Sequence, residues 1–233
     1  MPKFFVVSDT HGFCTLTKKA LDESGFERDN PNHWIIHCGD ILDRGSEAQD
    51  MIDFMMGLER KILVKGNHEI LMMELIERGY PGDHDWHNGT AQSIMQLAPD
   101  AGTWPEACPK VKPIVEQLFS QQVNFFETQN YVFVHSQIPY WLGNGWRDGS
   151  DEEWVDAMWG NPFDFWESVE IEGKTVCFGH WHVSYYNSPL NEFSENSDYG
   201  IAYGDGFIGL DACTAYSNRV NVLVIEDEFL EEI

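Results

Sequence analysis

The sequence predicts an α/β fold that fills a single domain over residues 1–233. Strand-like apolar stretches alternate with helix-like stretches over the first 80 residues, which is typical of parallel strands joined by right-handed crossovers. Hydrophobic residues make up 42% of the chain, which is enough for a packed core at this length. The sequence contains no internal repeat, low-complexity tract or clear linker that would divide it.

Three strand and helix pairs account for the first 80 residues. Each pair is an apolar strand and the helix that follows it: KFFVVSD with residues 15–25, WIIHCGD with residues 46–58, and KILVKGN with residues 69–78. Glycine ends the first helix at Gly25 and follows the third helix at Gly79.

Residues 80–130 break this alternation, and we interpret them as a helical insertion that walls one side of a site. They contain the polar loop YPGDHDWHNG, a helix over residues 90–97, a proline-rich link and a helix over residues 112–121.

The second half of the chain returns to strands, which we expect to form a second sheet packed on the first. These strands are YVFVHS, KTVCFGH, DGFIGLD and VNVLVIE. A turn at Ser217 and Asn218 separates the last two and predicts antiparallel pairing between them. Residues 184–206 are polar and glycine-rich, and loops of that length in a compact domain are usually functional, so we expect this loop near the site.

Composition excludes several classes of function. The formal net charge of −25 opposes general affinity for nucleic acid, which requires lysine and arginine to neutralise phosphates. No apolar run approaches the 18 or so residues of a membrane span. The start of the chain, MPKFFVVSDTHG, lacks the features of a signal peptide. Five cysteines without CxxC spacing favour a reduced, cytoplasmic protein.

Polar motifs follow the predicted strands, at the positions where α/β folds collect their ligand-binding residues. These motifs are SDTHG at 8–12, CGDILDRG at 38–45, KGNHE at 65–69, VHS at 134–136 and FGHWH at 178–182. Each contains a good metal ligand beside a glycine or another small residue.

The ligand types in these motifs predict a centre of two divalent metal ions. Asp9 and His11 can face one cation, and Asp40 on the adjacent strand can bridge it to a second. The second site would be completed by Asn67, His135 and His180. Mixed oxygen and imidazole ligands suit manganese, iron, zinc or nickel better than calcium.

All five motifs, in this order, resemble those of the calcineurin-like metallophosphoesterase superfamily. Within it the chain is most similar to the phosphoprotein phosphatase family in its short bacterial and phage form, and the segment IGLDACTAYSNRVNVLVI resembles the closing strand pair of that family. The resemblance implies a four-layer α/β/β/α sandwich of two mixed sheets. It also implies hydrolysis of phosphate monoesters by a bridging hydroxide, with manganese as the expected metal.

The resemblance assigns further roles around the metals. His68 matches the general acid and Asp43 the carboxylate that orients it. Arg44 and Asn67 match phosphate-binding residues. The family's second phosphate-binding arginine is missing after Trp159, where the sequence reads MWGNPF, so we assign that role to Arg147 as a hypothesis.

Four further residues have alternative interpretations. His182 is a candidate metal ligand because the second histidine of a GHxH motif binds metal in the wider superfamily, whereas the phosphoprotein phosphatases usually carry another residue there. We interpret Glu69 as a first-turn carboxylate favoured by the helix dipole. His84 and His87 resemble ligands, but their spacing favours a solvated loop.

The substrate stays open between alternatives at this stage. The resemblance favours a phosphoserine or phosphothreonine protein as substrate, with other small phosphate esters also accepted. The alternative enzyme is a diadenosine tetraphosphate hydrolase, which the low Lys and Arg count of 14 disfavours. A non-catalytic metal-binding scaffold is the alternative of another class. The oligomeric state is not determined by the sequence.

Overall fold

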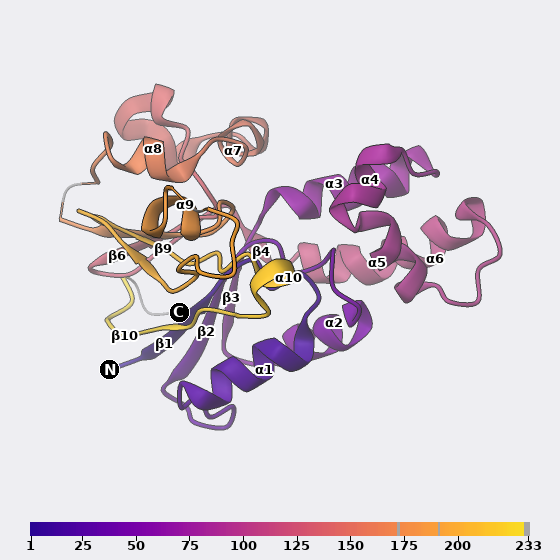
Figure 1. Cartoon of the computed structure of the whole chain (residues 1–233), viewed down its shortest axis with the longest axis horizontal. Helices are drawn as coiled ribbons and strands as arrows, with labels where there is room; N and C mark the ends of the chain where they lie inside the picture. Colours follow the sequence, from indigo (N-terminus) through magenta and orange to yellow (C-terminus); the bar gives the residue numbers. More distant parts are fainter. Residues whose placement is uncertain (172, 191, 231–233) are drawn as a thin grey trace.

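Two five-stranded sheets lie at the centre of the computed structural model, which describes residues 1–171, 173–190 and 192–230 (Figure 1). In the first sheet β1 to β4 are parallel, and β10 pairs antiparallel with β1. Its order is β10 (Leu223–Glu226), β1 (Lys3–Val7), β2 (His33–Cys38), β3 (Lys61–Val64) and β4 (Gln122–Val123).

The second sheet is also mixed. Its three central strands are parallel, and β5 and β8 are antiparallel edge strands. Its order is β5 (Phe126–Glu127), β6 (Tyr131–Phe133), β7 (Thr175–Phe178), β9 (Phe207–Gly209) and β8 (Ala202–Tyr203).

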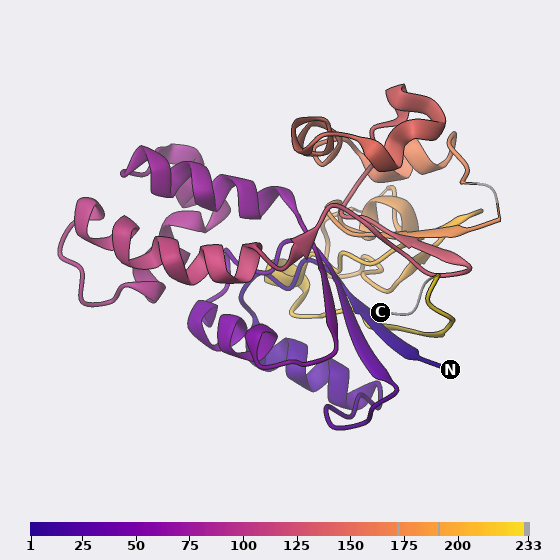
Figure 2. The ribbon, with the colours of Figure 1, turned by 180° about the vertical axis from the view of Figure 1, so that it is seen from behind.

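Helices cover the outer face of each sheet, so the predicted four-layer sandwich is confirmed (Figures 1 and 2). On the first sheet lie α1 (Cys14–Glu23) and α2 (Ala48–Met56). The next four helices pack on one another in a lobe that extends away from the sheets (Figures 1 and 2): α3 (Asn67–Arg78), α4 (Asp83–Asn88), α5 (Thr90–Leu97) and α6 (Trp104–Phe119). On the second sheet lie the 3₁₀ helix η1 (Tyr140–Asp148), α7 (Asp151–Ala157), α8 (Pro162–Trp166) and α9 (Ser184–Asn187). The short α10 (Thr214–Ser217) precedes β10.

β1 shows why its sequence is apolar without interruption. Successive side chains of a strand point to opposite faces, and here Phe4 and Val6 enter the core between the sheets whereas Phe5 and Val7 pack against the helices. All four are fully buried. Burial of each side chain contributes roughly 1.5 to 3 kcal/mol, so both faces of β1 stabilise the sandwich.

The last strand corrects one prediction. The segments DGFIGLD and VNVLVIE do not pair with each other, because β9 belongs to the second sheet and β10 pairs with β1 in the first. The predicted turn is the helix α10, followed by Asn218 in the left-handed conformation. Ile208 and Ile225 both face the core between the sheets, so the apolar pattern identifies the strands but not their neighbours.

The helix predicted over residues 112–121 is longer than expected. It begins at Trp104, so it includes Pro109 of the predicted proline-rich link, and it also contains Pro113, although proline usually interrupts helices. Its buried side chains recur at helical spacing, at positions 107, 108, 111, 115 and 118, and packing of that face outweighs the cost of the prolines.

Residues 184–206, predicted as a loop, contain the short elements α9 and β8; residue 191 lies outside the described residues. In the described part of the chain no helix is both long and apolar enough to cross a membrane.

Candidate active site

The predicted metal ligands converge at the carboxyl ends of β1, β2, β3, β6 and β7. Two groups of side chains place their ligand atoms within 4.8 Å of one another: one is His11, Asp40 and His68, and the other is Asp40, His135 and His180. Asp40 belongs to both groups, which is the position of a ligand that bridges two cations.

Left-handed backbone is concentrated at this site. Eight residues other than glycine have positive φ in the described part of the chain, and six of them are predicted site residues. Such conformations cost energy and persist where the surrounding structure enforces them, commonly at functional sites. The six, with φ from 47° to 78°, are Asp9, His11, Asp40, Asp43, Arg44 and His180.

Each of the three predicted histidine ligands is oriented by a backbone carbonyl. One ring nitrogen donates to that carbonyl, which fixes the tautomer and leaves the other nitrogen able to bind a metal. The pairs are His11 Nδ1 with the Leu42 oxygen at 3.0 Å, His135 Nδ1 with the Cys38 oxygen at 2.7 Å, and His180 with the Trp159 oxygen.

The free ligand atoms face one another at distances suited to cations. Asp40 Oδ2 lies 3.9 Å from His11 Nε2, and Asp40 Oδ1 lies 3.4 Å from His135 Nε2. Asn67 Oδ1 lies 2.8 Å from His135 Nε2 and 3.0 Å from His180 Nδ1. Ligand bonds of about 2 Å place neighbouring donors roughly 3 to 4 Å apart.

Asp9 completes the set from β1. Its Oδ1 lies 3.9 Å from His11 Nε2. Its Oδ2 accepts hydrogen bonds from Ser8 Oγ at 2.5 Å and from the His180 amide at 2.9 Å. Asp9 therefore ties the loop after β1 to the loop after β7, and one of its oxygens still faces His11.

The electrostatics of the donor set fit divalent cations. Burial lowers the pKa of His11 and lowers that of His180 to about 3, so both imidazoles are neutral and keep a lone pair for a metal. Burial, assisted by Asp211 and Asp40, raises the pKa of Asp9. Burial alone would raise the pKa of Asp40, but the surrounding histidines outweigh burial and the net pKa is lowered. Buried carboxylates this close together require compensating positive charge.

His68 and Asp43 form the predicted acid pair. His68 Nδ1 lies 2.7 Å from Asp43 Oδ2, and His68 Nε2 points toward Asp40 Oδ2 at 3.8 Å and the Arg44 guanidinium at 3.2 Å. Burial acts to lower the pKa of His68, but Asp40 and Asp43 outweigh it and the net pKa is raised. The two carboxylates therefore favour the protonated form of this imidazole.

Two side chains of the segment predicted as an insertion hold Asp43 in place. Thr90 Oγ1 donates to Asp43 Oδ2 at 2.6 Å, and Ser93 Oγ accepts from the Asp43 amide at 3.1 Å. Gly89 lies against the adjacent backbone, where an added Cβ would come within 2.1 Å of the Arg44 nitrogen. The first turn of α5 is therefore part of the candidate site.

Glu69 is a site residue that the sequence analysis missed. It is only 2% exposed, and its carboxylate accepts from the amides of Asp40, Ile41 and Gly66 at 3.1, 2.9 and 2.7 Å. Burial, with Asp40, raises its pKa to about 7. Glu69 is at the third position of α3, so the capping-box spacing was the available signal.

We expect Glu69→Gln to destabilise the fold by about 1 to 3 kcal/mol, because the amide nitrogen of Gln cannot accept from these buried amides. Metal affinity should fall about 10- to 100-fold, since the Asp40 loop loses its support. Denaturant unfolding and calorimetric metal titration measure the two effects. Glu74→Gln, at an exposed position of the same helix, is the matched control, and equal behaviour of the two variants would contradict this role.

Arg147 is not brought to the site. Its guanidinium pairs with Glu127, with Nη2 3.1 Å from Oε2, and lies 4.1 Å above the Trp146 ring. Lys174 also pairs with Glu127 at 2.6 Å. Glu127 therefore holds Arg147 and Lys174 close together. Lys174 lies just before β7 and His180 just after it, so Arg147 lies at the end of β7 opposite the candidate site. The geometry does not support Arg147 as a phosphate clamp, and in the described part of the chain Arg44 is the arginine that hydrogen-bonds site residues.

His182 also lies outside the two groups of ligands. Its Nε2 pairs with the Glu192 carboxylate, and its ring contacts the Phe193 ring at a centroid distance of 4.4 Å. The structure gives His182 a carboxylate partner and does not place it with Asp9 and His11.

The sequence pattern of the calcineurin-like phosphoesterases matches residues 2–184, and no curated protein sequence matches the chain.

Several solved structures share the fold. One is a proposed diadenosine tetraphosphatase, with a TM-score of 0.61 and 17% identity over 99% of this chain and 97% of that one. A cold-active protein-tyrosine phosphatase of a psychrophilic Shewanella species has a TM-score of 0.63 and 14% identity over 97% and 76% of the two chains. A protein serine/threonine phosphatase from Saccharomyces cerevisiae, similar to human phosphatase PP5, has a TM-score of 0.53 and 12% identity over 100% and 81%.

Proposed function

Because the chain belongs to the calcineurin-like phosphoesterase family, we propose that it hydrolyses phosphate monoesters at this site and acts on phosphoserine or phosphothreonine proteins. The observation that carries the proposal is the position of Asp40, which is shared by two groups of side chains able to hold a metal ion. One of these groups includes His68, whose imidazole lies 3.8 Å from Asp40 and to which we assign the role of general acid. Metal ligands and a general acid thus converge on one point.

The ligand set would hold two divalent cations, for which we propose manganese because the donors mix oxygen and imidazole nitrogen. When bound, such cations lower the pKa of water and polarise the oxygens of a phosphate. Asp40 would lie between them, with Asp9 and His11 on one side and Asn67, His135 and His180 on the other.

The other side chains handle the substrate. His68 donates its Nε2 proton to the leaving oxygen, while Asp43 holds Nδ1 and keeps the ring in place. Arg44 presents two guanidinium nitrogens, which now lie 3.1 Å from His11 Nε2 and 3.2 Å from His68 Nε2. A planar fork of this kind binds two phosphate oxygens at once, and the Asn67 amide lies beside it.

The charge of the site favours a phosphate monoester over a dinucleoside polyphosphate. The contacting arginine is Arg44, and the chain as a whole has 14 Lys and Arg residues against 39 Asp and Glu residues. Among the described residues Arg44 is the arginine that contacts site residues, so a chain of four linked phosphates would meet few cationic side chains beyond the metal ligands.

A side-by-side assay tests the proposal. Phosphoserine and phosphothreonine peptides, p-nitrophenyl phosphate and diadenosine tetraphosphate are compared by kcat/KM with added manganese, iron, zinc or nickel. We expect phosphopeptides to give the highest value and the dinucleotide the lowest. The highest value for the dinucleotide would make the protein a diadenosine tetraphosphate hydrolase, and absence of turnover by the metal-loaded protein would make it a scaffold.

A further inference from the structure

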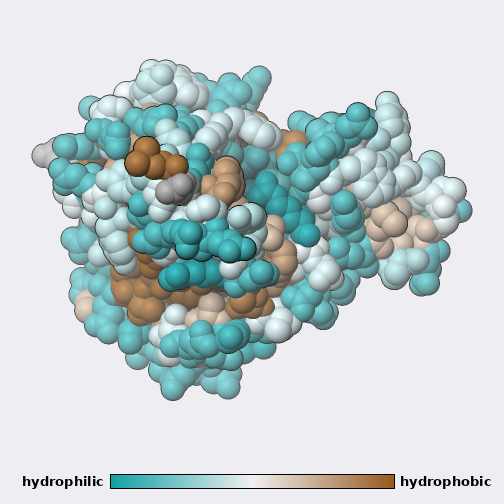
Figure 3. Space-filling model, viewed as in Figure 1, coloured by the Kyte–Doolittle hydropathy of each residue, from teal (hydrophilic) through white to brown (hydrophobic). Residues whose placement is uncertain are grey.

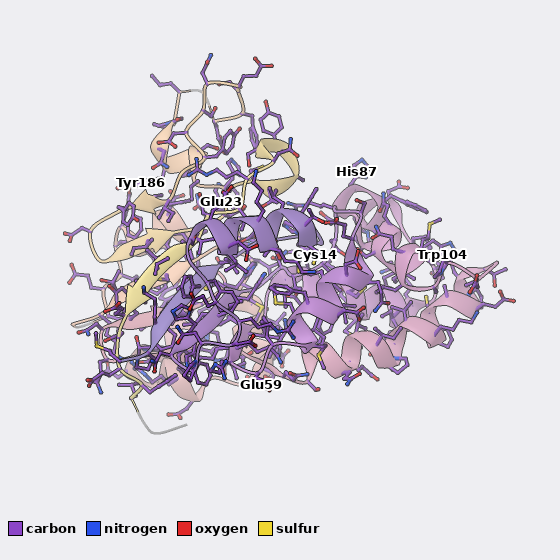
Figure 4. All side chains as sticks on the ribbon, turned by 90° about the horizontal axis from the view of Figure 1, so that it is seen from below. Cys14, Glu23, Glu59, His87, Trp104 and Tyr186 are labelled. Atoms are coloured by element: carbon purple, nitrogen blue, oxygen red, sulfur yellow. The ribbon has the colours of Figure 1, made fainter. Side chains whose placement is uncertain are left out.

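Beyond the active site, helices α4, α5 and α6 of the lobe carry an apolar groove of about 260 Å³. Its walls are the rings of Trp86 and Trp104, which meet edge to face with centroids 5.9 Å apart, and the side chain of Met95. Figure 4 shows Trp104 at the outer end of the lobe, and Figure 3 shows pale brown apolar surface over α5 and α6. The remaining lining residues are Ala98, Pro99, Ala101, Gly102, Thr103 and Ala107.

The groove exposes large apolar side chains that a folded protein normally buries. Trp86 is 43% exposed and Met95 is 54% exposed. Water in the groove therefore lies against a largely apolar wall. A large apolar side chain that displaced this water would gain the free energy of burial.

Three exposed carboxylates neighbour the lining residues of this groove along the chain: Asp83 one turn before Trp86, Asp100 next to Pro99, and Glu106 next to Ala107. The exposed Lys110 follows Ala107 by three residues. Glu106 also accepts a hydrogen bond from the amide of the lining residue Gly102 at 2.9 Å. An apolar groove with an acidic rim is complementary to an apolar side chain flanked by lysine or arginine.

The groove and the catalytic site share one short helix. Thr90 at the start of α5 holds Asp43, and Met95 lies in the second turn of the same helix. At 1.5 Å per residue the helix rises about 7.5 Å from Thr90 to Met95, and Asp43 and Arg44 lie one residue beyond Thr90 and Gly89, so the groove is on the order of 12 Å from the phosphate site. An extended peptide covers that distance in about four residues.

We propose that this groove docks a phosphoprotein substrate by an apolar side chain that lies about four residues from the phosphorylated residue and has basic neighbours. The inference rests on the proposed function and names the kind of protein that the site serves. Docking would raise the local concentration of the phosphate at Arg44 without any change in the chemistry.

The test uses a phosphoserine peptide with leucine four residues from the phosphoserine and lysines beside the leucine, a matched peptide with alanine in place of the leucine, and p-nitrophenyl phosphate. Met95→Asp introduces a charge into the exposed wall of the groove. We expect it to lower kcat/KM about tenfold for the leucine peptide, the effect of losing one buried apolar contact. The alanine peptide and p-nitrophenyl phosphate should be hydrolysed as by the wild type. The control Trp141→Ala changes a residue of similar exposure, 48%, in η1 and should leave all three substrates unchanged.

Binding of the unphosphorylated leucine peptide, followed by tryptophan fluorescence, separates this inference from the proposed function. If wild type binds this peptide and Met95→Asp does not, the docking site stands even where no phosphopeptide is hydrolysed. Equal binding by both proteins, or equal kcat/KM for the leucine and alanine peptides, would overturn it. Wild-type dimers that Met95→Asp converts to monomers, measured by light scattering, would also overturn it, because the groove would then hold a second copy of the chain.

Discussion

Replacing Asp40 with asparagine is expected to lower kcat by roughly 10³-fold or more and to remove at least one of the bound metal ions. The carboxylate is the ligand that both groups share, and asparagine keeps its shape but not its charge. Stabilisation of transition-state charge by metal ions amounts to several kcal/mol, and about 4 kcal/mol corresponds to 10³ in rate. Metal content by mass spectrometry and turnover of p-nitrophenyl phosphate measure the two effects.

Thermal unfolding provides a readout of this variant that does not depend on activity. Ligands that bind the folded state raise Tm, so manganese should raise the Tm of the wild type more than that of Asp40→Asn. Asp29→Asn, at an exposed position, is the matched control. A variant at Asp40 that retained the full metal-induced shift and normal turnover would show that Asp40 is not the shared ligand.

Replacing His68 with asparagine is expected to slow substrates with poor leaving groups far more than those with good ones. A positioned general acid contributes about 10²- to 10⁴-fold when the leaving oxygen needs a proton. We therefore expect kcat to fall by roughly 10²-fold or more for phosphoserine peptides and phenyl phosphate, and by less than about tenfold for 2,4-dinitrophenyl phosphate. The dependence of log kcat on leaving-group pKa should become steeper.

Asp43 provides an internal check on this assignment. Asp43→Asn should reproduce part of the same leaving-group dependence, and the double variant should be little slower than His68→Asn, because the two residues act as a unit. His87→Asn, on the exposed surface of α4, is the matched control for the histidine. Equal slowing of all leaving groups by His68→Asn would contradict its role as general acid.

The sequence predicted the architecture of this protein well because its strands are apolar on both faces and end in polar motifs. The two-sheet sandwich follows from those patterns together with the resemblance to the phosphoesterases. The placement of β10 was not predictable in this way, because Leu223 and Ile225 would fit the core from either sheet. Pairing depends on long-range packing, which hydrophobic alternation does not encode.

The convergence of the predicted metal ligands also has a clear physical origin, since parallel strands present their carboxyl ends at one edge. The role of Glu69 was missed because its backbone partners Asp40 and Ile41 belong to another strand and loop. The role assigned to Arg147 rested on its type and its place in the sequence, and only the structure shows that Glu127 and Trp146 hold it at the other end of β7.

The helical lobe has two parts, one that supports the candidate active site and one that forms the groove, and mutations in the two parts would have different effects. Its root, at Gly89 and Thr90, fixes the geometry of Arg44 and Asp43, so changes there would impair catalysis on every substrate. The groove around Trp104 touches none of these residues, so its shape and charge can change while the catalytic step is preserved. A lineage of such enzymes could therefore acquire new partners by altering the outer half of one lobe, whereas deletion of that lobe would remove the support that Thr90 and Ser93 give Asp43 along with the docking surface.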